Sequence, residues 1–223
     1  MQLVTFFDVD NTLLDNDRVS TDLREHLEHE IGEQRAGRYW QIFEDLRAQL
    51  GYADYLGALQ RYRVEHPRDH RVLAVSSFLM GYPFANRLYP GSLDAVEHAA
   101  RFGATAVLTD GDVVFQPRKI WRSGLHEAFA GNVLVYVHKE RELDDVAARY
   151  PADHYVLVDD KVRILAAVKA VWGSRITTVW PRQGHYAHDD AEVAKYPAPD
   201  VMIERIADLA FVSVDEVVAA GRR

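Results

Sequence analysis

The sequence predicts an α/β fold, a three-layer core around a parallel sheet with a helical-bundle cap domain inserted into it. Two observations lead to this prediction. Beyond residue 91, short apolar segments rich in β-formers alternate with segments of helical periodicity, as in βαβ units. Residues 17–83 show helical patterns and no convincing strand. We therefore expect a core domain from residues 1–16 and 84–223 and a cap domain from residues 17–83.

The first expected elements are one strand and the helices of the cap domain. Leu3–Phe7 is wholly apolar and predicts a strand buried on both faces. Apolar residues four apart then predict a helix that Ser20 or Thr21 caps and Gly32 ends, and similar patterns predict three more helices, up to Met80. The Tyr and Trp residues at helical spacing indicate a packed interior rather than a ligand site.

The remaining elements alternate along the core domain. Strands are expected at Ala104–Leu108, Val133–Val137, Tyr155–Val158, Ile176–Trp180 and Val201–Ile203, with helices at 92–102, 117–129, 140–150 and 162–172. The polar stretch 181–199 is expected to be a loop. A final helix begins at Ser213, has Glu216 as its capping-box partner and ends at Gly221.

Composition and charge limit the classes of function. Of 223 residues, 48% are hydrophobic and 27% charged, the balance of a globular protein. The net charge of -8 argues against nonspecific nucleic-acid binding, because phosphate contacts require Lys and Arg. No apolar run approaches the roughly 18 residues of a membrane span. Because the chain has no cysteine and no evident signal peptide, we expect a cytoplasmic monomer or homodimer without membrane or nucleic-acid partners.

Polar residues with chemical potential follow the expected strands at their carboxyl ends. They are Asp8 and Asp10, Thr109, Lys139, and Asp159 with Asp160. Parallel strands place these ends at one edge of the sheet, so we expect the side chains to converge on one crevice. Several carboxylates repel one another there unless a cation intervenes, and Mg²⁺ is the common divalent ion with oxygen ligands. A lysine and a hydroxyl beside it suit a phosphoryl group.

These residues resemble the four motifs of the haloacid dehalogenase (HAD) superfamily. Asp8-Val9-Asp10-Asn11-Thr12 after an apolar strand resembles motif I, and Thr109 at the end of Val107-Leu108-Thr109 resembles motif II. Lys139 falls where motif III places its lysine, and Asp159-Asp160 resembles motif IV. The motif order, the strand positions and the helical insert between motifs I and II all match. The resemblance covers nearly the whole chain and implies a Rossmann-like core.

The resemblance implies a role for each motif residue. Asp8 would be the nucleophile that forms an aspartyl-phosphate, and Asp10 would protonate the leaving oxygen and then activate water. Thr109 would donate to phosphoryl oxygens, and Lys139 would neutralise charge. Lys119, ten positions after Thr109, is a rival for the motif III role, but Lys139 is better placed directly after a strand.

The resemblance also implies a Mg²⁺ site. Asp8, the backbone carbonyl of Asp10 and a motif IV aspartate would hold the ion. Asp160 is favoured as the direct ligand, and Asp159 would support it from further out. Two departures bear on this site: Lys139 is followed by Glu140 where the family often has proline, and no acidic residue follows Asp160 within five positions.

Substrate contacts are expected from the edge of the sheet and from the loop 181–199. That loop leaves the carboxyl end of a strand, so Gly184, His185 and Tyr186 are candidates, together with Asp110. The His-x-x-His pattern in the loop lacks the third ligand that a zinc site requires. Four cap residues could meet a substrate anion, although solvated helix faces explain them equally well: Arg38, Tyr39, Arg61 and Arg63.

We therefore expect a Mg²⁺-dependent phosphomonoester hydrolase that acts on a small phosphorylated metabolite. Asp10 favours phosphate over halide, because the 2-haloacid dehalogenases of the superfamily need no leaving-group acid and lack a carboxylate at that position. A phosphomutase and a dehalogenase-like hydrolase remain as alternatives. An alternative from another class is a catalytically weak protein that binds a phospho-ligand or regulates a partner.

Overall fold

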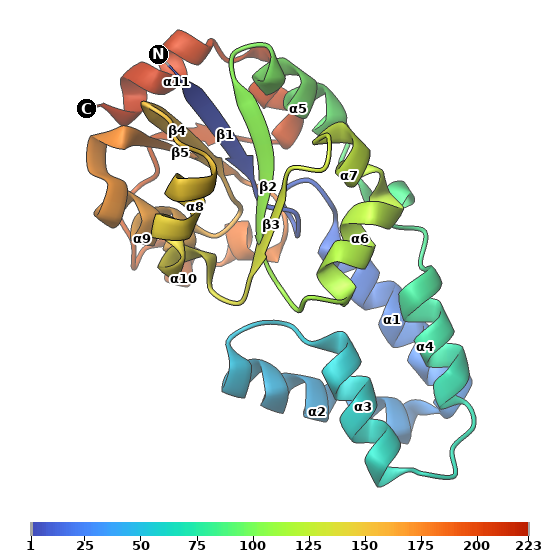
Figure 1. Cartoon of the computed structure of the whole chain (residues 1–223). Helices are drawn as coiled ribbons and strands as arrows, with labels where there is room; N and C mark the ends of the chain where they lie inside the picture. Colours follow the sequence, from blue (N-terminus) through green and yellow to red (C-terminus); the bar gives the residue numbers. More distant parts are fainter. Residues whose placement is uncertain (1, 223) are drawn as a thin grey trace.

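The structure is a computed structural model that describes residues 2–222. Its centre is an all-parallel sheet in the order β3-β2-β1-β4-β5-β6 (Figure 1). The strands are β1 (Leu3–Phe7), β2 (Ala104–Asp110), β3 (Val133–Tyr136), β4 (His154–Val158), β5 (Ile176–Pro181) and β6 (Val201–Ile203). The predicted α/β class and parallel sheet are confirmed. Because β1 lies between β2 and β4, the connections change direction there, and this is where such sheets place their ligand crevice.

Helices cover both faces of the sheet and make the fold three-layered. One face packs against α5 (Ser92–Ala100), α6 (Phe115–Ser123), α7 (Leu125–Ala128), η5 (Ile206–Phe211) and α11 (Val214–Gly221). The other packs against α8 (Leu143–Arg149) and α9 (Val162–Trp172). Successive residues of a strand point to opposite faces, so Leu3 and Phe7 join the first apolar cluster, and Val4 and Phe6 the second.

Four helices follow β1 and lie beyond the carboxyl ends of the strands (Figure 1). They are α1 (Asn16–Ile31), α2 (Glu33–Leu50), α3 (Tyr55–Glu65) and α4 (Val72–Gly81), and the 3-10 turn η1 (Phe84–Arg87) leads back to the sheet. Their apolar residues belong to the same cluster as one face of the sheet. The Phe115 ring lies 5.4 Å from the Tyr55 ring and 5.8 Å from the Phe84 ring, so the cap domain is packed against the core.

The start of α1 differs from the prediction. The helix begins at Asn16, and the carboxylate of Asp15 accepts a hydrogen bond from the Arg18 backbone N–H at 2.9 Å. Ser20 and Thr21 therefore lie inside the helix and do not cap it. Asp15 meets the same requirement for an N-terminal acceptor one turn earlier.

Three further expectations were wrong in detail. The predicted helix 117–129 is two helices, because Gly124 adopts φ 82° and ends α6. The Ser213 side chain makes no capping hydrogen bond, so the predicted capping box is absent. The expected loop 181–199 contains η4 (His185–His188) and α10 (Asp190–Val193). The remaining short turns are η2 (Lys139–Arg141) and η3 (Gly173–Arg175).

Within residues 2–222, no helix is long and apolar enough to cross a membrane.

Asp22 of α1 ties the cap domain to the segment that returns to the sheet. Its Oδ2 atom lies 2.6 Å from Arg87 Nη2 and also accepts a hydrogen bond from the Tyr82 hydroxyl. Arg18 Nε lies 2.9 Å from the other oxygen. Burial alone raises the pKa of Asp22, but the hydrogen bonds from Tyr82 and Arg87 outweigh burial, and the pKa lies below its usual value.

We predict that Asp22→Asn lowers the free energy of unfolding by about 1 kcal/mol at pH 7. The folded-state pKa is depressed, so this stabilisation exists above the unfolded pKa near 4 and disappears as the pH falls through the folded value. Urea denaturation at several pH values from 7 downward measures it. Asp45→Asn, at an exposed position of α2, is the control and changes little. A difference between wild type and Asp22→Asn that stays constant with pH would contradict this account.

Candidate active site

The strands β1 and β4 deliver three aspartates to one edge of the sheet. The two strands are paired up to Phe7 and Val158, and the Asp8 backbone N–H donates to the Val158 carbonyl at 2.9 Å. Asp8, Asp159 and Asp160 follow directly and are at most 4% exposed. One oxygen from each can be chosen so that all lie within 4.8 Å of one another. The predicted convergence of these carboxylates is therefore present in the fold.

Lys139 lies between two of these aspartates. Its Nζ atom is 2.5 Å from Asp8 Oδ1 and 2.7 Å from Asp159 Oδ2, and it donates to the Leu108 carbonyl at 3.1 Å. Burial lowers the pKa of Lys139, but the Asp159 and Asp8 carboxylates more than compensate, so its pKa lies above the usual value. The side chain is a buried ammonium that neutralises part of the cluster's charge.

The remaining charge of the cluster has no protein partner. Asp8 Oδ2, Asp159 Oδ2 and both carboxylate oxygens of Asp160 are buried without a hydrogen bond from any residue between 2 and 222, although Asp159 Oδ2 lies 2.7 Å from Lys139 Nζ. Burial raises the pKa of Asp160, the nearby Lys161 ammonium opposes this, and repulsion from Asp159 and Asp8 adds to it, so the pKa lies well above its usual value. Buried carboxylate oxygens without donors are costly unless a cation binds them. An all-oxygen set of this kind fits Mg²⁺.

The two motif IV aspartates are bonded differently. Asp159 Oδ1 accepts a hydrogen bond from the Lys161 backbone N–H at 2.8 Å, and Oδ2 makes no hydrogen bond but lies 2.7 Å from the Lys139 ammonium. The Asp160 carboxylate is held in place through its backbone instead: its N–H donates to Thr12 Oγ1 and its carbonyl accepts from Trp180 Nε1, both at 2.9 Å. This arrangement favours Asp160 over Asp159 as the direct metal ligand.

Gln183 and Asn11 fix the loop that carries Asp10. The Gln183 amide donates to the carbonyls of Asn11 and Thr12 at 3.2 and 2.7 Å, and its Oε1 accepts from the Ile206 N–H. Asn11 has φ 59°, a left-handed conformation that asparagine tolerates better than most residues. Sequence reasoning did not identify Gln183, because nothing local to it shows that it spans to a loop about 170 positions earlier.

Asp10 forms an ion pair with a second buried lysine, Lys119. Lys119 is 1% exposed, and its Nζ lies 2.5 Å from Asp10 Oδ1 and 3.0 Å from Asn16 Oδ1. The Asp10 side chain is 25% exposed and borders a cavity at the junction with the cap domain. The sequence presented Lys119 as a rival of Lys139, whereas the structure places one lysine beside each motif I aspartate.

Thr109 and Asp110 lie at the end of β2, next to the site. The Gln116 amide donates to Thr109 Oγ1 at 3.0 Å, and the Thr109 hydroxyl donates to the Asp110 carbonyl across a long distance of 3.5 Å, a bond that a ligand oxygen could replace. Asp110 Oδ1 accepts from the Lys139 backbone N–H at 2.8 Å, and its carboxylate borders the cavity. Burial raises the pKa of Asp110. Gln116 is a second contact that the sequence analysis missed.

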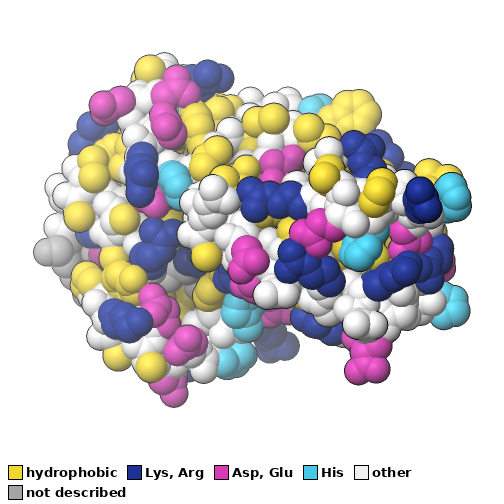
Figure 2. Space-filling view, turned by 90° about the horizontal axis from the view of Figure 1, so that it is seen from below, with side chains coloured by type: hydrophobic (Ala, Val, Ile, Leu, Met, Phe, Trp, Pro, Cys, Tyr) yellow, Lys and Arg dark blue, Asp and Glu magenta, His cyan; other side chains and the backbone are white. Residues whose placement is uncertain are grey.

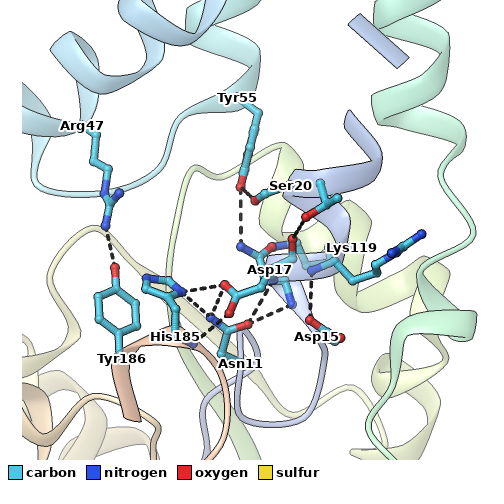
Figure 3. A network of polar contacts seen from close by, with 12 residues as sticks. Asn11, Asp15, Asp17, Ser20, Arg47, Tyr55, Lys119, His185 and Tyr186 are labelled. Carbon is cyan, nitrogen blue, oxygen red and sulfur yellow. Dashed lines mark hydrogen bonds and ion pairs between the residues drawn. The ribbon is translucent and has the colours of Figure 1, made fainter. Parts of the chain in front are cut away.

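The 184–186 segment joins the core to the cap domain (Figure 3). Gly184 has φ 73°, and a Cβ atom there would lie 2.6 Å from Asn11 Cβ, so only glycine fits. His185 Nδ1 lies 2.6 Å from Asp17 Oδ1, which turns this ring toward α1. The Tyr186 hydroxyl accepts a hydrogen bond from Arg47 Nη2 at 2.6 Å, and Tyr186 borders the cavity.

The four cap residues that were candidates for contact with a substrate anion lie away from the site, as expected for solvated or packed helix faces. Lys and Arg side chains are numerous on the cap-domain side of the surface (Figure 2). Arg38, however, pairs with Glu65 at 2.6 Å, and the buried Tyr39 hydroxyl donates to a backbone carbonyl. Neither these two nor Arg61 and Arg63 border the cavity. Arg47 borders the cavity and Arg24 an adjoining hollow, and sequence reasoning singled out neither of these two cap arginines.

Comparisons with known proteins agree on one family. A family model described as haloacid dehalogenase-like hydrolase matches residues 4–171. A haloacid dehalogenase-like hydrolase from Burkholderia xenovorans LB400 is 60% identical, with a TM-score of 0.92 over 96% of this chain and 98% of that chain. No curated protein matches.

Two more distant structures share the fold. The HAD-hydrolase YfnB from Bacillus subtilis, bound to magnesium, is 15% identical, with a TM-score of 0.62 over 94% of this chain and 97% of that chain. An L-2-haloacid dehalogenase from Xanthobacter autotrophicus is 17% identical, with a TM-score of 0.59 over 95% and 98% of the two chains. At these identities the likeness concerns the fold alone.

We predict opposite effects of Asp160→Asn on the metal-free and metal-loaded protein. Without metal, the variant melts at a higher temperature than wild type, because a buried charge without a donor is removed. With Mg²⁺ at about 100 times its dissociation constant, wild type gains about 2.7 kcal/mol, or about 5 °C or more, and the variant gains little.

Thermal melting in EDTA and in a MgCl2 series measures both effects. Asp144→Asn, on an exposed position of α8, is the control and responds to Mg²⁺ like wild type. An Asp160→Asn protein that is stabilised by Mg²⁺ as strongly as wild type would show that the ion is held elsewhere.

Proposed function

This chain belongs to the haloacid dehalogenase-like hydrolase family, and on that premise we propose that it is a Mg²⁺-dependent phosphomonoester hydrolase. Its substrate is a small phosphorylated metabolite, and the reaction passes through an aspartyl-phosphate on Asp8. The observation that carries the proposal is the carboxylate of Asp10, which borders the cavity and lies on the loop directly after Asp8. Phosphate transfer to Asp8 needs an acid for the leaving oxygen, whereas expulsion of halide does not.

In the first half-reaction, an oxygen of Asp8 attacks phosphorus. The new bond joins Asp8 to phosphorus, and the bond between phosphorus and the leaving oxygen breaks. Lys139 holds Asp8 Oδ1, so Oδ2 is the oxygen without a protein donor. Thr109 turns its hydroxyl hydrogen from the Asp110 carbonyl, 3.5 Å away, to a phosphoryl oxygen, while Gln116 continues to donate to the same hydroxyl. Asp10 gives its proton to the leaving oxygen.

In the second half-reaction, Asp10 takes a proton from water, and the water oxygen attacks phosphorus. The bond between Asp8 and phosphorus breaks, which releases inorganic phosphate and restores the Asp8 carboxylate. Asp10 is then a carboxylate when it acts as the base, and Lys119 at 2.5 Å stabilises that state. Mg²⁺, when bound by Asp8, Asp160 and the backbone carbonyl of Asp10, with Asp159 behind them, supplies positive charge to the phosphoryl oxygens. The unpartnered oxygens of Asp8 and Asp160 support this ligand set.

The alternatives make different products. A phosphomutase returns an isomeric phosphate ester instead of inorganic phosphate, and a dehalogenase-like hydrolase releases halide without metal. A catalytically weak phospho-ligand protein binds phosphate analogues without turnover.

A cytoplasmic location and a monomeric or homodimeric state remain predictions from composition.

Hydrolysis of p-nitrophenyl phosphate with Mg²⁺ tests the proposal. We expect turnover that EDTA removes, no turnover for Asp8→Asn, and a kcat lowered by about 10²–10⁴-fold for Asp10→Asn. Both substitutions keep the size of the side chain and remove its charge. Asp144→Asn is the control and retains activity.

The same preparations should be incubated with 2-chloropropionate and assayed for chloride. Release of chloride in EDTA that depends on Asp8, together with no release of phosphate, would replace the phosphatase proposal by a dehalogenase. Tight binding of a phosphate analogue without release of phosphate, halide or an isomeric ester would support the binding protein instead.

A further inference from the structure

The cavity beside Asp10 is larger than a phosphoryl group requires. It measures about 400 Å³ and reaches from the edge of the sheet to the cap domain. An adjoining hollow of about 460 Å³ shares much of its lining, including Asp10 and Arg47. Aromatic side chains form much of the wall: Tyr52, Tyr55, Phe115 and Tyr186. This space suits an ester whose organic part is flat or apolar.

Two cations meet at Tyr186, at the end of this cavity. Arg47 reaches from α2 to the Tyr186 hydroxyl, with Nη2 at 2.6 Å from the oxygen (Figure 3). From the core side, Lys161 Nζ lies 5.2 Å from the centre of the Tyr186 ring. Both cations border the cavity and the adjoining hollow. One comes from each domain, so they converge only when the cap domain lies against the core.

Neither cation forms a short ion pair. Arg47 pairs only with Glu44, at 3.6 Å on the exposed surface of α2. Lys161 forms no ion pair with the residues that the structure describes, but it also faces the aspartate cluster: burial lowers its pKa, and the Asp160 and Asp8 carboxylates raise it above the usual value. The other pairs in this region are complete: Lys119 with Asp10 and Lys139 with Asp8 and Asp159. Arg47 and Lys161 are therefore available to a ligand.

The hydrogen-bonding groups around Tyr186 that remain without a partner are donors. Its oxygen already accepts from Arg47, so its own hydrogen remains to be donated. Arg47 keeps further N–H groups and Lys161 its ammonium. Each of the four acids that line the cavity has a donor of its own: Glu192 pairs with Lys195 at 2.5 Å, Asp189 Oδ1 accepts from the Glu192 N–H, Asp110 Oδ1 accepts from the Lys139 N–H, and Asp10 pairs with Lys119. A group of donors without a free acceptor selects an anion.

We propose that Arg47, Lys161 and Tyr186 form a second anion subsite, so the substrate is a phosphomonoester of an organic acid. The inference rests on the proposed function, which places the phosphoryl group at Asp8. The carboxylate of the substrate lies beside Arg47 and Tyr186, on the cap-domain side of the cavity, and its organic body lies along the aromatic side chains. The subsite is complete only with the cap domain closed, so binding of this carboxylate also favours closure.

A pair of substrates of nearly equal size tests the subsite. In 4-carboxyphenyl phosphate and 4-carbamoylphenyl phosphate only the charge of the distal group differs. For wild type we expect kcat/KM to favour the carboxylate at least tenfold, chiefly through KM. Arg47→Gln and Lys161→Gln each lower this ratio about tenfold, and Arg47→Lys restores part of it. Because kcat/KM for the two esters is compared within each variant, an effect of the substitution on phosphoryl transfer itself cancels in the ratio.

Arg68→Gln is the matched control, because Arg68 is an exposed cap-domain arginine that does not border the cavity. We expect it to keep the wild-type ratio. A wild-type ratio near one, or an equal loss in Arg68→Gln, overturns the subsite even if both esters are hydrolysed.

Calorimetry with 4-carboxybenzylphosphonate and 4-carbamoylbenzylphosphonate separates the subsite from the proposed function. These analogues cannot be hydrolysed, so their binding is measured on the wild-type protein with Mg²⁺. A tenfold preference for the carboxylate that Arg47→Gln removes supports the subsite even if no ester is turned over, in which case only the hydrolytic proposal fails. Equal affinity or no binding of either compound overturns it.

Discussion

Repulsion among three buried carboxylates is the constraint on which the rest of the structure depends. Asp8, Asp159 and Asp160 lie at the ends of the adjacent strands β1 and β4, and each is at most 4% exposed. Water does not screen their charge there, so the fold supplies one buried ammonium, Lys139, between Asp8 and Asp159. Apart from Asp159 Oδ2, which lies beside the Lys139 ammonium, the oxygens of the cluster without hydrogen-bond donors lie on Asp8 and Asp160. A cluster arranged in this way contributes little to the stability of the fold but is well suited to bind a cation.

The surroundings of the cluster fix it in position rather than neutralise it. Thr12 and Trp180 hold the backbone of Asp160, and Gln183 holds the loop between Asp8 and α1. Gly184 then passes so close to Asn11 that no side chain fits. The segment after Gly184 carries Tyr186, which meets the cap domain. The same loop contacts therefore determine both the geometry at the phosphoryl end of the cavity and the position of the cap domain over it.

The sequence was sufficient for the parallel strands and for the residues that lie at their ends. Leu3–Phe7 is an uninterrupted apolar run, and the topology of alternating strands and helices then brings Asp8 and Asp160 together across 152 positions. It was not sufficient for contacts between side chains of distant elements. Lys119, Gln116 and Arg47 lie on helices whose local pattern shows only which face is buried. The start of α1 was misplaced because Ser20, Thr21 and Asp15 are all acceptable caps, and the turn at Asn11 decides among them.

The central claim is that Asp8 carries the phosphoryl group between the two half-reactions. The most direct measurement is acid quenching during turnover of p-nitrophenyl phosphate, followed by mass spectrometry of the peptide that contains Asp8. The account predicts one added phosphoryl group on Asp8 in wild type, more of it in Asp10→Asn because the water-activating base is missing, and none in Asp8→Asn. Turnover with the phosphoryl group on another residue, or with no modified peptide in Asp10→Asn, would contradict it.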